Sequence, residues 1–216
     1  MLPKNQKALS RLSLFYSKSR IKNIRNKFYS KAQCFRANFS NVSFINVNFK
    51  GAILTNCSFK HAEFSQVEFL GSNLKKSNFT NAKFKYCVFS ATLLKKSNFK
   101  GCTFENCIFV NTNVNVAKNM IIGDSNRCFS QHPSPVISSS TMHLLDELRF
   151  HPKIQNSRVL HLKGGKLNSL TVFSLLERLG EDKLVVGLKN LNGTLPYRIV
   201  TANGLCNAID KASREG

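Results

Sequence analysis

The sequence has few acidic residues, with 11 Asp and Glu against 32 Lys and Arg among 216 residues. Because the acidic residues are also scattered, no pair of carboxylates is a candidate for acid–base catalysis. The formal net charge is +21, and a field of this sign attracts polyanions or the acidic surface of another protein. The excess is largest in residues 1–31, which hold nine basic residues and no acidic one.

The sequence also lacks a long hydrophobic run. No stretch of 18 apolar residues occurs, so the sequence predicts no transmembrane segment. A short apolar patch at residues 12–16 is interrupted by serine and flanked by charge, unlike the core of a secretory signal. We therefore expect a cytoplasmic protein, and we leave open that it is a secreted effector.

Metal and disulfide patterns are missing as well. The seven cysteines form no Cys-x-x-Cys pair, and an odd number at irregular spacing argues against a disulfide framework and against a thiolate zinc site. Gly164-Gly165 lacks the spacing of a phosphate-binding loop and is typical of a turn. The sequence therefore predicts no metal site, no cofactor, no catalytic residue and no enzymatic activity. The histidines, which show no metal-ligand spacing, are His61, His132, His143, His151 and His161.

What the sequence does contain is a period of five residues. Sixteen consecutive five-residue units run from Ala37 to Val116 without an insertion. The third place of each unit is Phe, Leu or Val, and the first place is Ala, Val, Cys, Ser or Thr. A period of five matches neither the helix nor the strand. Unbroken repetition of a short unit instead indicates a solenoid, in which each repeat packs on its neighbours.

This pattern resembles that of the pentapeptide-repeat family. The resemblance implies an all-β solenoid, a right-handed quadrilateral β-helix in which four units make one coil and the first and third residues point inward. The sequence independently favours four units per coil, because the third places without Phe recur every 20 residues, at Leu54, Leu74, Leu94 and Val114. We expect about four coils, with one wall that takes smaller aliphatic side chains.

The register also predicts the place of five cysteines. Cys57, Cys87, Cys102 and Cys107 fall in the small inward place, and Cys34 falls in a central place if a partial coil precedes Ala37. We expect these thiols to be buried and reduced. Cys87 and Cys107 would stack in adjacent coils, where a disulfide is the alternative.

Lysines stand out among the residues that point outward. The string LKKSNF occurs at residues 74–79 and 94–99, so its two copies should lie in adjacent coils. Stacked like charges repel weakly in water, and an anionic partner would relieve this repulsion. The alternative is that the side chains are solvated and bind nothing. The candidate anion-contact surface consists of Lys60, Lys75, Lys76, Lys95, Lys96 and Lys100.

The outer faces of two walls are unusually apolar. Exposed together, such side chains would cause association, so we expect a segment of this chain or a second subunit to cover them. A further wall should carry two exposed ion pairs between coils, Glu63 with Lys83 and Lys85 with Glu105. The candidate apolar interface consists of Ile53, Leu70, Val88, Leu93, Ile108 and Val110.

The segments beside the repeat complete the predicted organisation. Residues 1–33 form a basic N-terminal arm with loose helical periodicity, which would cap the solenoid of residues 34–116. Residues 117–140 are predicted to be a linker, and residues 141–216 a small α+β module. In this module we expect helices at 141–150, 169–179 and 203–211, and strands at 159–163, 184–188 and 197–200.

The sequence predicts a bacterial scaffold without enzymatic activity. Its partner would be a protein or a second copy of this chain, and its basic surface would contact an anion. One alternative is binding of nucleic acid or of an anionic membrane through the N-terminal arm. Another is modulation of DNA gyrase or another topoisomerase, which the resemblance implies for some members. The excess of lysine makes this chain a poor mimic of an anionic duplex.

Overall fold

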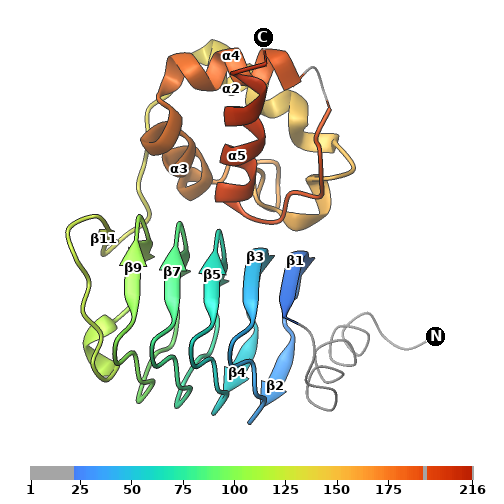
Figure 1. Cartoon of the computed structure of the whole chain (residues 1–216). Helices are drawn as coiled ribbons and strands as arrows, with labels where there is room; N and C mark the ends of the chain where they lie inside the picture. The colour runs from blue at the N-terminus through green and yellow to red at the C-terminus, as the bar shows by residue number, and fades with distance from the viewer. Residues whose placement is uncertain (1–21, 192–193, 216) are drawn as a thin grey trace. The chain divides into compact units, whose positions relative to one another are not determined.

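A computed structural model describes residues 22–191 and 194–215 of the chain (Figure 1). The chain divides into two compact units, Met1–Gln131 and His132–Gly216, and each is described by itself. The first 21 residues, where the sequence predicts most of the basic helical arm, lie outside the described residues.

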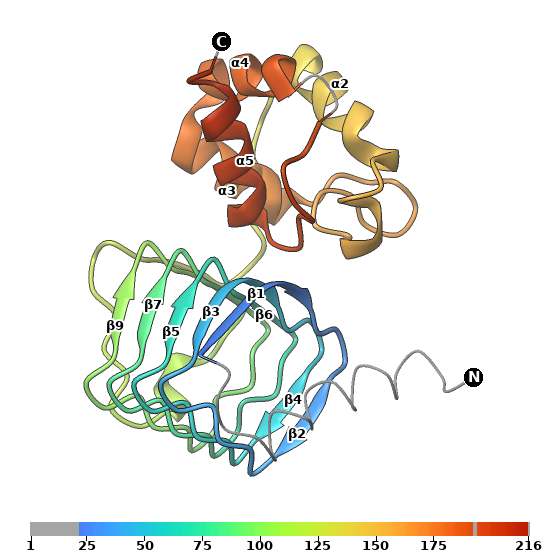
Figure 2. The same cartoon turned by 45° about the vertical axis from the view of Figure 1, so that its right-hand side comes forward.

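The first unit is a β-solenoid, as the repeat predicts. Its strands are β1 (Asn23–Phe28), β2 (Gln33–Phe35), β3 (Ser43–Asn48), β4 (Ile53–Thr55), β5 (Glu63–Ser65), β6 (Glu68–Leu70), β7 (Lys83–Lys85), β8 (Val88–Ser90), β9 (Thr103–Glu105), β10 (Ile108–Val110) and β11 (Arg127–Phe129). Strands pair in parallel, and Phe44 lies beside Phe64, which lies beside Phe84. This offset of 20 residues means that four pentapeptides make one coil. Figure 2 shows β1, β3, β5 and β7 side by side.

The solenoid has about five turns, and not the four that the sequence predicts. An additional coil precedes Ala37, because β1 pairs with β3 and β2 pairs with β4. Its central residues Ile24, Tyr29 and Cys34 are buried like the later ones. The prediction of an arm over residues 1–33 is therefore wrong for 23–28. The coil escapes the sequence pattern because two of its first places hold lysine, Lys22 and Lys27, and both are exposed.

The solenoid also extends past the last recognisable repeat. A short 3-10 helix, η1 (Val114–Val116), ends the sixteenth unit. Farther on, β11 pairs with β10, and the Asn126 side chain accepts a hydrogen bond of 2.8 Å from the backbone N–H of Cys107. Part of the segment predicted to be a linker over residues 117–140 therefore belongs to the solenoid. It supplies hydrogen-bond partners to the backbone of the last coil.

The core consists of columns of stacked central residues. We number the walls by these columns: the first contains Phe39, Phe59, Phe79 and Phe99, the second Phe44, Phe64, Phe84 and Phe104, the third Phe49, Phe69, Phe89 and Phe109, and the fourth Leu54, Leu74 and Leu94. Stacked rings lie close to parallel, with centroids 4.7 Å apart for Phe64 and Phe84. Rings of the second and third walls meet edge to face, as Phe84 and Phe89 do at 5.6 Å. Both arrangements are favourable for aromatic pairs.

Polar residues at the first place are satisfied inside this core. The buried Ser77 hydroxyl donates to the carbonyl of Leu54 at 2.7 Å, and Ser97 donates in the same way to Leu74 at 2.8 Å. Of the five cysteines that the register places inward, Cys34, Cys57, Cys87 and Cys107 are buried as predicted and Cys102 is half-buried. Burial raises the pKa of Cys34 to about 12 and that of Cys57 to about 11, so these two thiols stay protonated at neutral pH.

The backbone conformation at the corners of the coils explains which residues occupy the fifth place of the repeat. Every fifth residue from Asn26 to Asn111 has a positive φ, between 44° and 69°. Asn and Gly tolerate this left-handed conformation best, and they fill most of these corners. At Gly101 space also matters, because an added Cβ would lie 2.2 Å from the side-chain oxygen of Asn81.

The second unit is helical, so the prediction of an α+β module is wrong in its strands. It contains α2 (Ser139–Glu147), η2 (Leu148–Phe150), η3 (Gln155–Ser157), α3 (Ser169–Leu179), α4 (Glu181–Leu191) and α5 (Ala202–Ala212). Residues 184–188, predicted as a strand, lie within α4, because Leu184, Leu188 and Leu191 recur at helical spacing and are all buried. Residues 159–163 form only an isolated bridge, His161 with Leu167.

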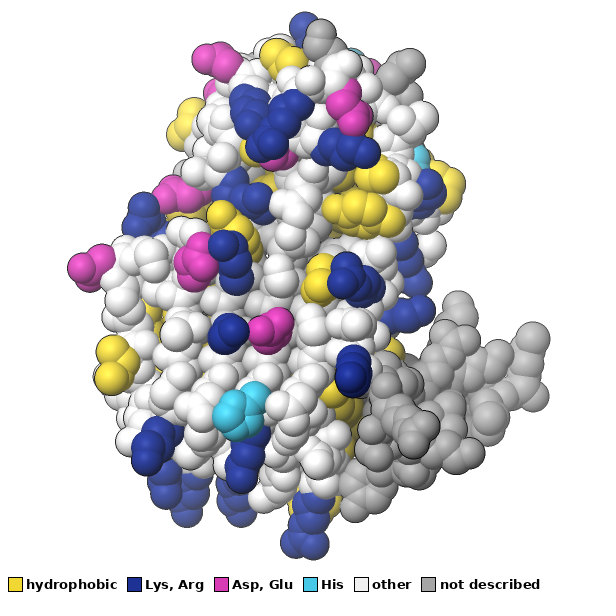
Figure 3. Space-filling model, viewed as in Figure 1, with side chains coloured by type: hydrophobic (Ala, Val, Ile, Leu, Met, Phe, Trp, Pro, Cys, Tyr) yellow, Lys and Arg dark blue, Asp and Glu magenta, His cyan; other side chains and the backbone are white. Residues whose placement is uncertain are grey.

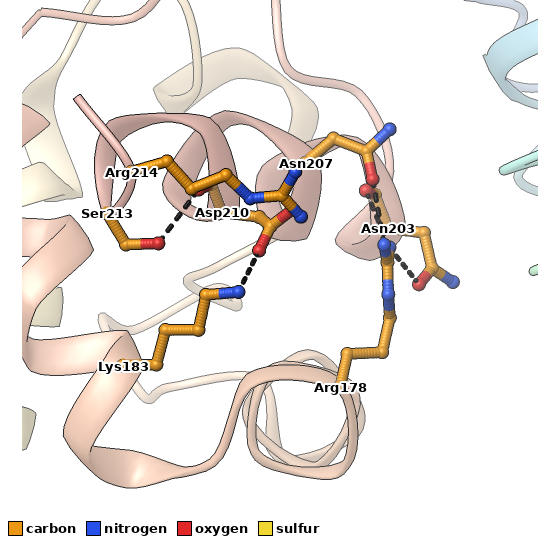
Figure 4. Close-up of polar contacts among 7 residues, drawn as sticks. All are labelled: Arg178, Lys183, Asn203, Asn207, Asp210, Ser213 and Arg214. Carbon is orange, nitrogen blue, oxygen red and sulfur yellow. Dashed lines mark hydrogen bonds and ion pairs between the residues drawn. The ribbon is translucent and has the colours of Figure 1, made fainter.

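Polar side chains fasten the last helix to its neighbours (Figure 4). Arg178 of α3 donates to the side chains of Asn203 and Asn207 at 3.0 and 2.9 Å. Lys183 of α4 forms an ion pair with Asp210 of α5, which is the main reason that the pKa of Asp210 is lowered. The N-termini of two helices are capped as well, because Asn168 is the N-cap of α3 and Thr201 is the N-cap of α5.

We expect replacement of one stacked ring to destabilise the solenoid strongly. Phe84 is buried between Phe64 and Phe104, so Phe84→Ala should cost about 3–5 kcal/mol. Phe84→Leu is the matched control and should cost below about 1.5 kcal/mol, because the fourth wall accepts leucine at this place. Chemical denaturation measures both, and equal stability of Phe84→Ala and wild type would contradict this account of the core.

A second prediction concerns the contact between α4 and α5. A Cβ at Gly187 would lie 2.5 Å from the backbone oxygen of Ile209, so Gly187→Ala should destabilise the second unit by about 1–3 kcal/mol. Gly123→Ala is the control, since nothing lies within 4 Å of its added Cβ. Thermal unfolding followed by circular dichroism of the helices tests this, and unchanged melting of Gly187→Ala would refute the close approach.

Candidate functional site

The predicted lysines lie on the outer faces of the first and fourth walls. The backbone N–H of Lys76 donates to the carbonyl of Lys95 at 3.2 Å, which places the two LKKSNF copies in adjacent coils as predicted. Lys76, Lys95 and Lys96 are exposed and Lys75 is half-buried. On the first wall, Lys60 and Lys100 are exposed and lie two coils apart, with Thr80 between them.

These six lysines, which we call the lysine surface, have no acidic neighbour on their walls. Residues 22–131 contain four acidic residues, Glu63, Glu68, Glu105 and Asp124, and none of them lies on the first or fourth wall. Among the described residues, no lysine of this surface forms an ion pair. Figure 3 shows basic side chains along the lower edge of the solenoid, with acidic side chains only higher on that face.

The second wall shows the opposite arrangement. Lys83 pairs with Glu63 at 3.2 Å, and Lys85 pairs with Glu105 at 2.6 Å, so both predicted ion pairs are confirmed. The hydrogen bond that Lys85 donates to Glu105 raises the pKa of Lys85. Exposed pairs of this kind add little stability, but they neutralise the charges of Lys83 and Lys85. The lysines of the lysine surface have no such partners in the described part of the chain.

The fold does not explain the choice of lysine at the corner. Lys76 and Lys96 have φ values of 61° and 63°, in a conformation that costs a side chain more than it costs Gly or Asn. Asn56 occupies the same corner one coil earlier, so asparagine fits this place. A requirement outside folding is the simplest reason for two consecutive lysines there.

The candidate apolar interface divides between two walls. On the third wall, Val88, Ile108 and Val110 are buried and Leu70 is half-buried. On the fourth wall, Ile53 and Leu93 are 41% and 47% exposed. The structure thus brings two of the six predicted residues onto the fourth wall, which also carries the lysines of the two LKKSNF copies. Both residues are accessible to solvent.

Sequence reasoning missed two more apolar residues of the fourth wall. Phe35 is 59% exposed and pairs with Thr55 in the next coil, and Val116 is 41% exposed at the far end of the wall. Phe35 was missed because the sixteen units begin at Ala37, whereas the coils begin earlier in the chain. A register extended backward to Ala32 would have placed it in an outward position.

The second unit has an open cleft. The cleft has a volume of about 900 Å³, and Met142, Asp146, Arg149 and Leu162 are among its lining residues. Asp146 contacts Nε2 of His161 at 3.1 Å and accepts from Arg149 at 2.6 Å. Burial lowers the pKa of His161. Within the described residues His161 contacts no hydroxyl or thiol, so a nucleophile is missing from this group.

The described residues hold neither a metal site nor a membrane-spanning helix. No group of three or more His, Cys, Asp or Glu in that part of the chain could hold a metal ion. No helix there is long and apolar enough to cross a membrane.

Known proteins provide an independent comparison. A solved structure similar to this chain is the pentapeptide repeat protein Rfr23 from the cyanobacterium Cyanothece 51142, at 19% identity and a TM-score of 0.31, covering 43% of this chain and 67% of that one. Another is the pentapeptide repeat protein alr5209 from Nostoc PCC 7120, at 16% identity and a TM-score of 0.29, covering 56% of this chain and 95% of that one. A third is QnrB1, a plasmid-mediated fluoroquinolone resistance protein, at 14% identity and a TM-score of 0.21, covering 50% and 86%.

No curated protein matches the chain. A family model described as a pentapeptide repeat region matches residues 32–103. Its first residue, Ala32, is the first place of the unit that contains Cys34 and Phe35, so the match has the register of the coils. Residues 32–103 of this chain are therefore a pentapeptide repeat region.

Proposed function

We propose that this chain is a scaffold without enzymatic activity and that its solenoid binds an anionic partner through the lysine surface. The observation that carries the proposal is the group of six lysines without an ion pair on two walls without an acidic residue. Stacked ammonium groups repel by below about 1 kcal/mol in water, and a bound anion replaces this repulsion with attraction. Binding of a protein partner or of a second copy stays a prediction.

The other functions predicted from the sequence receive less support. An enzyme needs a complete catalytic group, and among the described residues the His161–Asp146 pair forms no hydrogen bond with a hydroxyl or thiol. A modulator of topoisomerase that imitates duplex DNA needs a negative surface, whereas the first and fourth walls are positive. Binding through the N-terminal arm depends mainly on residues outside the described ones.

Retention on immobilised heparin, a polyanion, tests the proposal. The quadruple variant Lys75→Gln, Lys76→Gln, Lys95→Gln and Lys96→Gln should elute at clearly lower salt than wild type. Each lysine contact that is lost reduces the number of counterions released when the protein binds heparin. The matched control replaces four exposed lysines elsewhere by glutamine: Lys22, Lys27, Lys163 and Lys189.

The control variant has the same net charge as the test variant, so a nonspecific effect of charge would shift both equally. We expect the control to elute close to wild type. Equal elution of the two variants would show that the lysine surface is not the binding site, and the proposal would then be wrong.

A further inference from the structure

The fourth wall combines positive charge with exposed apolar side chains. Its fifteen outward places across five coils hold five basic residues, four apolar residues, six neutral polar residues and no acidic one. The basic residues are Arg36, Lys75, Lys76, Lys95 and Lys96, and the apolar residues are Phe35, Ile53, Leu93 and Val116. All four apolar side chains are exposed. In the described part of the first unit, Ile121 is the one other large apolar side chain that is exposed to this degree.

The arrangement of these side chains follows from the coil register. Ile53 lies beside Asn73, which lies beside Leu93, so the two aliphatic side chains share one column. Lys75 and Lys95 occupy the next column, and Lys76 and Lys96 the corner. With coils about 4.8 Å apart, the wall is about 20 Å long from Phe35 to its last coil. Apolar and basic groups therefore occupy adjacent columns of one wall.

We propose that the fourth wall binds the surface of an anionic lipid bilayer. The inference rests on the proposed function and names the partner of the same surface. Lysines attract the acidic headgroups of a bilayer, while Phe35, Ile53, Leu93 and Val116 enter the boundary between headgroups and acyl chains. Peripheral membrane segments combine these same two features, a basic polar part and an apolar part that includes Phe or Leu.

Two other anionic partners fit this wall less well. Single-stranded nucleic acid is bound by aromatic platforms on which successive bases stack, but Phe35 is the single aromatic residue at the outward places of the wall. A globular protein partner favours an interface core poor in lysine, whereas Lys75 and Lys95 lie directly beside the Ile53 and Leu93 column. A partner with charge at its surface and hydrocarbon below allows the lysines to meet anionic groups while the aliphatic side chains between them are removed from water.

The test is sedimentation of the full chain with vesicles. Wild type should bind vesicles of phosphatidylcholine with about a third phosphatidylserine at physiological salt, and should not bind pure phosphatidylcholine. The quadruple Lys→Gln variant should lose affinity by about several hundredfold, since each of the four lysines near the surface contributes about fivefold.

A variant of the apolar column separates this inference from the proposed function. Ile53→Asn with Leu93→Asn introduces the residue that the same column already contains at Asn73, so the fold accepts it. The net charge does not change. We expect vesicle binding to fall at least about tenfold, because burial of each large aliphatic side chain is lost, while retention on heparin stays at the wild-type level. Val136→Asn with Phe150→Asn, two exposed residues of the second unit, is the matched control and should bind vesicles normally.

Each outcome decides between the two ideas. Vesicle binding that is unaffected by Ile53→Asn with Leu93→Asn would overturn the membrane inference and leave simple anion binding. Tighter binding to single-stranded RNA than to vesicles, lost in the same variant, would overturn it in favour of nucleic acid. Loss of neither heparin nor vesicle binding in the lysine variant would contradict the proposed function as well.

Discussion

Stacking of the central side chains between coils is the interaction on which this protein depends. The rings of Phe64, Phe84 and Phe104 follow one another at 4.7 and 4.9 Å, which is also the spacing of hydrogen-bonded strands. Ring stacking and backbone pairing therefore favour the same register. A slip of one residue would turn each central side chain toward solvent, so the turns of this narrow solenoid are held in one register.

This register converts sequence spacing into surface columns. Residues 20 apart become neighbours, and each wall acquires its own character from a few outward places. The second wall pairs its lysines with glutamates, while the fourth wall stacks lysines on lysines beside Ile53 and Leu93. Because the core needs only the first and third places and the corner needs a residue that tolerates positive φ, the remaining places are free to serve a partner. The residues of the lysine surface and of the Ile53 and Leu93 column occupy those places.

Most of the solenoid could be predicted from the sequence, because its core positions repeat without interruption. The four-sided coil, the buried cysteines and the ion pairs of the second wall all followed from one register. The first coil could not be predicted, since Lys22 and Lys27 replace the small first residue at an end of the repeat. In the second unit, Leu184, Leu188 and Leu191 have helical spacing, but the apolar run from Leu184 to Leu188 is equally typical of a strand, and only packing against α5 decides between the two.

The sequence by itself determined the period, the direction of each side chain in the repeat and the alignment of the two LKKSNF copies. Those properties follow from local rules that apply to every unit. Only the tertiary structure decided which outward side chains stay accessible, burying Val88 and Val110 and leaving Phe35, Ile53 and Leu93 exposed. The physical reason is that the repeat fixes the direction of each side chain locally, whereas its exposure depends on what packs around the wall in the folded chain.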